Sequence, residues 1–231
     1  MTDTAAIFER LYSAERALRE SEEQFFASGE PDALARAVHA AVEEARKLAA
    51  GDERSIRLYR LAMLCAELPG PEPIEALLSI LDEDDLSARA EAGESLLELA
   101  YERYKEVAAA VEARLARNHE GPSMEELPFI LTEVYDPDPV PLVARFLAHP
   151  TADIVAAAIE ALATYGDPAS LSKLRPLMRD ARTVMVPDLE GGEATIGELA
   201  SEAVSGLSPE PRPSNRGPSP RGAGGRKGRP S

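Results

Sequence analysis

The sequence lacks tryptophan and contains one cysteine and three histidines among its 231 residues. A single cysteine, Cys65, cannot form a disulfide within the chain, which is typical of a reducing compartment. The N-terminus has no apolar segment resembling a secretion signal, and no run approaches the roughly 18 apolar residues of a membrane span. These absences predict a soluble, cytoplasmic protein without membrane association.

The few residues suited to catalysis or metal binding show no useful spacing. His39, His119 and His149 fall in three different segments, and Cys65 lies in an apolar helical pattern without a nearby histidine. The acidic run 82–85 lacks the glycine and the distal glutamate of a calcium loop, so a polar turn between helices is the better interpretation. We therefore expect Cys65 to be a small buried hydrophobe, and we expect no catalytic residue, metal site or cofactor.

Charge is abundant but unevenly placed. The 41 acidic and 25 basic residues give a net charge of -16. Residues 208–231 hold one acid, Glu210, and six basic residues: Arg212, Arg216, Arg221, Arg226, Lys227 and Arg229. This tail therefore carries +5 and the preceding body -21. A body of that charge repels phosphate backbones, so any contact with nucleic acid is expected only through the tail.

The tail is rich in proline, glycine, serine and arginine, which predicts disorder because it cannot bury enough apolar surface to fold. Three roles remain open for it. It is an inert solubilising end, an arm for nucleic acid or another acidic surface, or a segment that folds back on the acidic body.

Residues 136–168 begin and end on Asp-Pro and enclose two amphipathic helical patterns, with Gly166 at the position of a C-cap. The same pattern occurs 66 residues upstream. The aligned apolar pairs are Ile74 with Val140, Leu77 with Val143, and Leu81 with Leu147. A further copy fits between them, which gives a period near 33 residues. A two-helix unit of this length predicts an all-α solenoid of roughly five or six stacked helix pairs.

The Asp-Pro mark and the motif Val-x-x-Ala-Ile-Glu-Ala-Leu-x-x-Tyr-Gly at 155–166 resemble the HEAT-repeat family, notably its short bacterial form. We expect a HEAT-like solenoid over 1–207, with irregular capping helices over 1–68 and regular repeats over 69–207. Pro128 is expected to interrupt the second helix of its unit. Residues 183–196 predict a β-hairpin insertion that turns at Gly191-Gly192, with a plain long loop as the alternative.

Three helices are expected before the regular repeats. Residues 4–27 place Ile7, Leu11, Leu18 and Phe25 on one face, which either caps the core or pairs with a second chain. Residues 32–50 form the next helix. The third, over 55–68, is apolar on most sides and is expected to be buried.

The resemblance implies that second helices line a concave surface used for protein binding. Glu94, Glu160 and Glu202 occupy the same place in three second helices. Six further carboxylates extend this negative field: Glu91, Glu98, Glu126, Glu133, Asp153 and Glu198. Such a field attracts basic partners; the alternative is that these are simply solvated helix residues.

The resulting hypothesis is a non-catalytic scaffold or adaptor for a protein partner with a basic segment. HEAT-like enzymes are the alternative: phycobilin lyases, or DNA glycosylases, which rely on a basic groove that this acidic body lacks. HEAT-like hydroxylases hold metal through several His-Glu pairs, whereas only His119-Glu120 has that form here.

Overall fold

The chain folds into ten α-helices and one β-hairpin within residues 3–186 and 192–208, the residues that the computed structural model describes. The first five helices are α1 (Thr4–Ala27), α2 (Pro31–Arg46), α3 (Asp52–Ala66), α4 (Pro71–Leu81) and α5 (Leu86–Ala116). They are followed by α6 (Pro122–Thr132), α7 (Val140–Phe146) and α8 (Ala152–Tyr165). The last unit comprises the 3-10 helix η1 (Pro168–Ser170), α9 (Leu171–Leu174), the 3-10 helix η2 (Arg175–Arg179), β1 (Thr183–Met185), β2 (Glu193–Thr195) and α10 (Ile196–Leu207).

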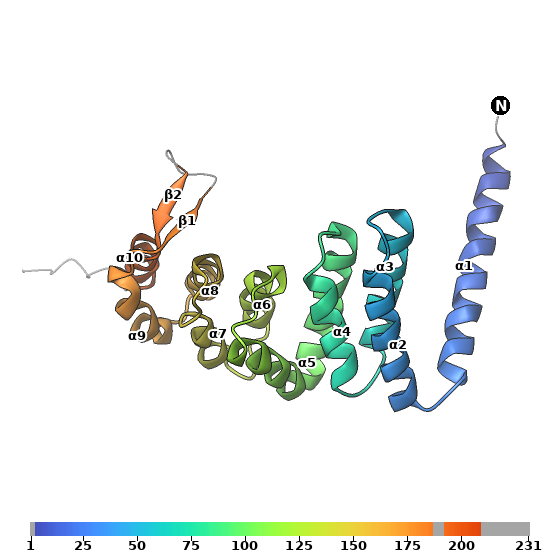
Figure 1. The fold of residues 1–231 in the computed structure, drawn as a ribbon, viewed down its shortest axis with the longest axis horizontal. Helices are drawn as coiled ribbons and strands as arrows, with labels where there is room; N and C mark the ends of the chain where they lie inside the picture. Colours follow the sequence, from blue (N-terminus) through green and yellow to red (C-terminus); the bar gives the residue numbers. More distant parts are fainter. Residues whose placement is uncertain (1–2, 187–191, 209–231) are drawn as a thin grey trace, which may run out of the picture.

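The helices form antiparallel pairs that stack into one curved row, which confirms the predicted all-α solenoid (Figure 1). The pairs are α2 with α3, α4 with the first part of α5, the second part of α5 with α6, α7 with α8, and α9 with α10. The second helices α6, α8 and α10 pack against one another along the inner side of the row, and α7 and α9 follow the outer side. The inner side is therefore a surface built from consecutive second helices.

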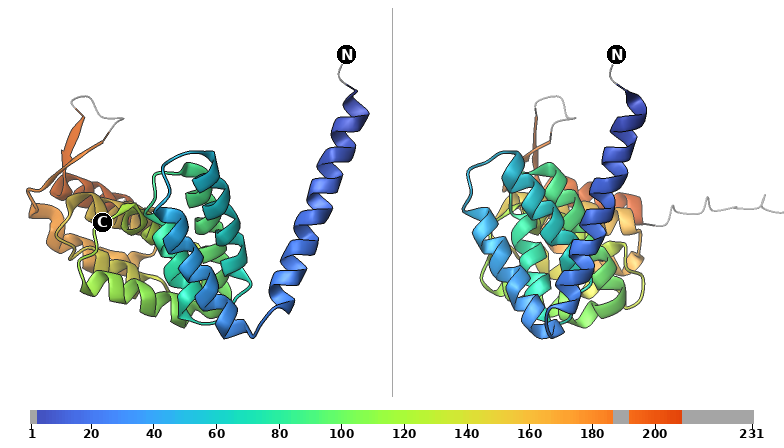
Figure 2. Two further views of the ribbon diagram at one scale, coloured as in Figure 1. Left: turned by 45° about the vertical axis from the view of Figure 1, so that its right-hand side comes forward. Right: turned by 90° about the vertical axis from the view of Figure 1, so that its right-hand side faces the viewer.

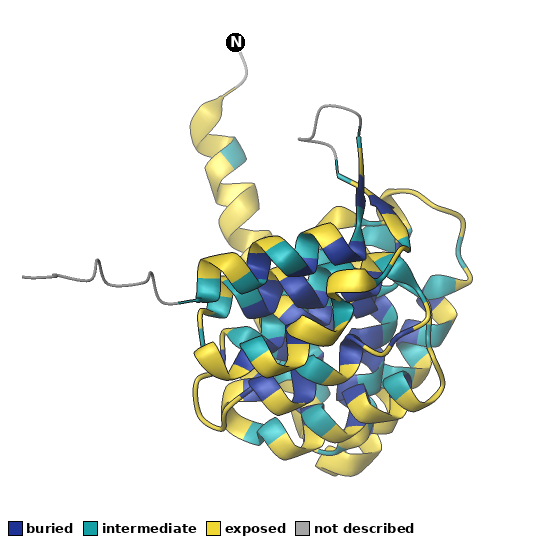
Figure 3. Cartoon of the chain, turned by 90° about the vertical axis from the view of Figure 1, so that its left-hand side faces the viewer, coloured by how far each residue is buried: buried dark blue, intermediate teal, exposed yellow. Residues whose placement is uncertain are grey.

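One continuous apolar core runs through the row from Leu34 to Ala203. It forms because leucine, isoleucine, valine and alanine recur every three or four residues, so each helix turns an apolar stripe toward both its partner and the neighbouring pair. Figure 3 shows the buried residues between the helices and the exposed residues on the rim. The second helix α8 illustrates the pattern, burying Ile154, Val155, Ala158, Ile159, Ala161 and Leu162.

Helix α5 joins two repeats without a loop. Its backbone departs from helical geometry at Arg103 (φ -132°, ψ 41°), which divides it into the second helix of one pair and the first helix of the next. The guanidinium of Arg103 donates hydrogen bonds to the carbonyl oxygens of Leu68 (2.8 Å) and Gly70 (2.6 Å), so the kink also secures the turn after α3.

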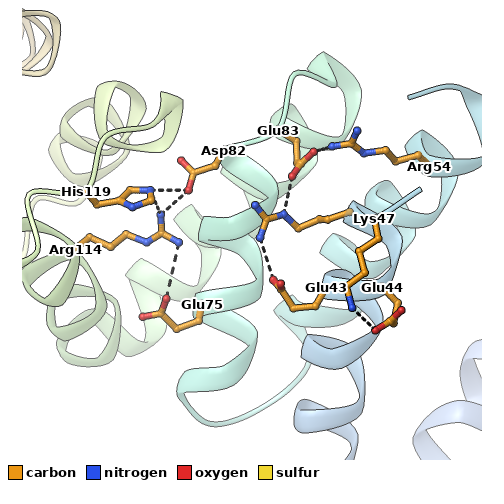
Figure 4. A network of polar contacts seen from close by, with 10 residues as sticks. Glu43, Glu44, Lys47, Arg54, Glu75, Asp82, Glu83, Arg114 and His119 are labelled. Carbon is orange, nitrogen blue, oxygen red and sulfur yellow. Dashed lines mark hydrogen bonds and ion pairs between the residues drawn. The ribbon is translucent and has the colours of Figure 1, made fainter. Parts of the chain in front are cut away.

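The acidic run 82–85 connects three successive pairs (Figure 4). Glu83, only 6% exposed, accepts a 2.6 Å hydrogen bond from Arg46 of α2 and pairs with Arg54 of α3. Asp82 pairs with Arg114 of α5 at 2.7 Å and with His119 at 2.8 Å. The run is thus part of the packing between repeats, as well as the turn that was predicted.

Two other predictions, the end of α8 and the hairpin insertion, also agree with the structure. Gly166 adopts the left-handed conformation (φ 79°) that ends α8, as predicted from its position. Strands β1 and β2 pair antiparallel, with Val184 opposite Ala194, so the predicted hairpin insertion is confirmed; Gly191 of its turn lies outside the described residues.

Two expectations about helices need correction, and a third observation concerns α1, whose apolar face was expected either to cap the core or to pair with a second chain. Pro128 does not interrupt its helix, since α6 continues through it to Thr132 while Leu127 and Leu131 are buried beside it. Helix α3 buries only one face, and Ile56 on the other face is 60% exposed. Helix α1 buries no residue at all and diverges from the row (Figures 1 and 2).

Candidate functional site

A hollow lies on the inner side of the row, over α6, α8, α10 and β1. Its volume is about 700 Å³. We call it the acidic groove, and its lining consists of Glu125, Phe129, Asp153, Ala156, Ala157, Ile159, Glu160, Ala163, Val184, Met185, Val186, Leu199, Glu202, Ala203, Gly206 and Leu207. Alanine and glycine along α8 and α10 have small side chains, which leave the space that forms the hollow.

The groove combines an apolar floor with a rim of one charge sign. Its four charged lining residues are all carboxylates: Glu125, Asp153, Glu160 and Glu202. Within the described part of the chain, none of the four forms a salt bridge or a side-chain hydrogen bond. Four carboxylates around an apolar floor favour a ligand that presents both cationic and apolar groups.

The pKa of Glu125 reflects its partial burial and the nearby carboxylates. Partial burial, reinforced by the negative charge of Asp153, raises the pKa of Glu125 above its ordinary value of 4.5. A cation seated between the two carboxylates would relieve that repulsion. Arg89 already supplies part of this positive charge to Glu125.

A second, smaller hollow of about 320 Å³ continues the groove toward the N-terminus. It shares Phe129 with the acidic groove and is lined by Arg89, Ala90, Gly93, Glu94, Leu97, Glu126, Phe129, Ile130 and Glu133. Its charge is partly compensated, because Arg89 pairs with Glu126. The two hollows thus share Phe129 and together lie over α5, α6, α8 and α10.

The nine carboxylates predicted from the sequence divide between these hollows and other places. The acidic groove receives Asp153, Glu160 and Glu202, and the smaller hollow receives Glu94, Glu126 and Glu133. Glu91 instead contacts Tyr59, whose pKa it raises through a hydrogen bond. Glu198 closes the capping box of α10 with Thr195, and Glu98 is exposed on α5 outside both hollows.

Sequence reasoning missed Glu125 and the apolar floor beneath it. The prediction selected Glu126, one residue further on, which is held by Arg89. The available signal was spacing: Glu125 lies four residues before the exposed Phe129 and therefore on the same helical face.

The cysteine and two of the three histidines are in contact with other side chains or buried. Cys65 is buried, as predicted, and burial raises the pKa of its thiol to about 12. His119 lies against Asp82 and Arg114, and His149 is buried, which lowers its pKa. No group of three or more His, Cys, Asp or Glu side chains within residues 3–186 and 192–208 is arranged to hold a metal ion.

The structure bears differently on the predicted tail and on the predicted absence of a membrane span. The six basic tail residues and the expected disorder of 208–231 fall outside the described residues, apart from Ser208. In the part of the chain that the structure covers, no helix combines the length and hydrophobicity needed to cross a bilayer.

Comparison with known proteins supports the architecture. A family model of HEAT repeats matches residues 128–185, which span the second half of α6 through β1 and include the whole α7–α8 pair. No curated protein matches the chain. The match covers the repeat identified from its Asp-Pro marks, which contributes Asp153 and Glu160 to the acidic groove.

Proposed function

We propose that this chain, which contains HEAT repeats, is a non-catalytic adaptor that holds a basic segment of a partner protein in the acidic groove. The observation that carries the proposal is the groove itself: four carboxylates, without an ion-pair partner among residues 3–186 and 192–208, surround an apolar floor over consecutive second helices. HEAT repeats commonly serve as protein-interaction scaffolds, and stacked pairs offer an extended surface instead of an enclosed chamber.

The chemistry of the groove defines the kind of segment that fits. Apolar side chains of the partner would contact Phe129, Met185 and Leu199, and arginine or lysine would face the carboxylates on the rim. Exposed ion pairs add little affinity individually, but together they orient the segment and accelerate its encounter with the groove. Binding should therefore weaken as ionic strength rises.

Charge reversal tests this function. The variant Asp153→Lys, Glu160→Lys, Glu202→Lys should weaken capture of a basic partner from a lysate of the source organism by about 10- to 100-fold, because three attractive contacts become repulsive. These three side chains are exposed, so circular dichroism should report an unchanged fold.

A matched control is available on α1. Glu9→Lys, Glu20→Lys, Glu23→Lys makes the same change in net charge at three exposed positions outside the groove. This control should retain the partner. Equal capture by both variants would show that net charge, or another surface, determines binding, and the groove proposal would be rejected.

A further inference from the structure

The C-terminal tail leaves the body at the edge of the acidic groove. Gly206 and Leu207, the last residues of α10, line the groove, and the next residue, Ser208, ends the helix by donating a 2.7 Å hydrogen bond to the carbonyl of Val204. The 23 residues 209–231 follow directly. The tail therefore starts beside the site proposed for a partner.

The tail is also complementary to the groove in charge. The groove lining contributes four carboxylates and no basic residue, whereas the tail contains six basic residues and one acid. Prolines at 209, 211 and 213 lack backbone N–H donors and cannot continue α10 as a helix.

The distances between the two sets of charges are short enough for contact. Arg212 follows Leu207 by five residues, a reach of about 16 Å for an extended chain, whereas Glu202 lies only about 7.5 Å back along α10. Arg216 and Arg221, further along the tail, have the reach to meet the carboxylates on α8 and α6.

We propose that the basic tail occupies the acidic groove of its own chain and competes with the partner for it. This inference rests on the proposed function and adds its regulation. Because the tail is covalently attached beside the groove, its effective concentration there is in the millimolar range, so weak individual contacts suffice for substantial occupancy. A partner must then displace the tail, which restricts the groove to segments that bind more tightly.

Mobility of the tail in the full-length chain gives a direct test. A fluorophore is attached through Ser214→Cys; Cys65 stays unlabelled because it is buried and its thiol has a pKa of about 12. The label should show high anisotropy in low salt. Anisotropy should fall when ionic strength is raised about tenfold, because screening shortens the range of the attraction.

Two full-length variants locate the contact. Glu125→Gln, Glu160→Gln, Glu202→Gln should release the label, whereas Glu9→Gln, Glu20→Gln, Glu23→Gln on α1 should not. Equal mobility of the label in the wild type and in both variants would overturn the inference. Anisotropy that falls on dilution would also overturn it, because the tail would then bind a second molecule.

A peptide comprising residues 208–231 separates this inference from the proposed function. Added in trans, it should bind at least about tenfold more tightly to a full-length chain whose six basic tail residues are replaced by glutamine than to the wild type, because no tail competes. Equal affinity for both chains would reject occupancy by the tail but retain the groove as a basic-segment site. Failure to bind either chain would also reject the inference, and the capture experiment would then decide the proposed function alone.

Discussion

At the scale of single residues, neighbouring carboxylates in the run 82–85 have different roles. Glu83 is enclosed between Arg46 and Arg54, and Asp85 caps α5 by accepting a 2.8 Å hydrogen bond from the amide of Ala88. Asp84, between them, is exposed. The sequence shows four acids in a turn, whereas burial and partners determine which of them stabilise the fold.

This difference predicts unequal effects of two similar substitutions. Glu83→Gln should lower the free energy of unfolding by about 2–3 kcal/mol, because Arg46 and Arg54 lose their shared anion; the loss is moderated by the partial exposure of both arginines. Asp84→Asn should change it by less than about 0.5 kcal/mol. Urea unfolding of both variants measures the difference, and similar values for the two would contradict the assignment.

The raised pKa of Glu125 predicts a pH-dependent loss of folding stability. A carboxyl that binds its proton more tightly in the folded chain opposes folding when ionised, and this cost grows as the pH rises through the raised value, above 4.5. Glu125→Gln should therefore slightly raise the melting temperature at neutral pH, and the gain should vanish below about pH 4. A clear loss of stability at neutral pH would indicate that Glu125 has a structural role.

At the scale of elements, α1 differs from every other long helix because it has no buried residue. Its contacts with the row are limited: Phe25 packs against the core, and Glu22 lies 3.7 Å from Arg60 of α3. The row therefore begins structurally at α2, whose buried stripe includes Val38 and Val42.

Deletion of residues 1–29 should consequently leave the body intact. We expect the free energy of unfolding to change by less than about 1 kcal/mol, since little apolar surface is uncovered. Leu58→Ala in α3, at a fully buried position, should cost about 2–5 kcal/mol and serves as the comparison. A deletion as damaging as Leu58→Ala would mean that α1 is an essential cap.

Local sequence signals predicted the elements well where the fold depends on local chemistry. The Asp-Pro marks, Gly166 and the residues flanking the hairpin act through backbone preferences of a few residues, so the repeat from 136 to 168 and the insertion were predictable. Pro128 was misleading because its cost of about 3 kcal/mol in a helix is outweighed by the packing of Leu127 and Leu131. The kink at Arg103 depends on acceptors in a preceding turn, which no local pattern reveals.

At the scale of the whole molecule, stacking produces the site. Glu125 and Asp153 are far apart in sequence and become neighbours only because α6 packs against α8. A carboxylate ladder was predictable from repeat alignment, but which carboxylates are free was not, since Arg89 neutralises Glu126 from another repeat. The groove is therefore a property of the assembled row and not of one repeat.

The central claim is that the inner surface of α6, α8 and α10 holds a basic, partly apolar segment. Hydrogen–deuterium exchange of the full-length chain, with and without a synthetic peptide that alternates arginine and leucine, measures where such a segment binds. The account predicts slower exchange in α6, α8 and α10, reversed by high salt. Slower exchange confined to the outer helices α7 and α9, or to α1, would contradict it.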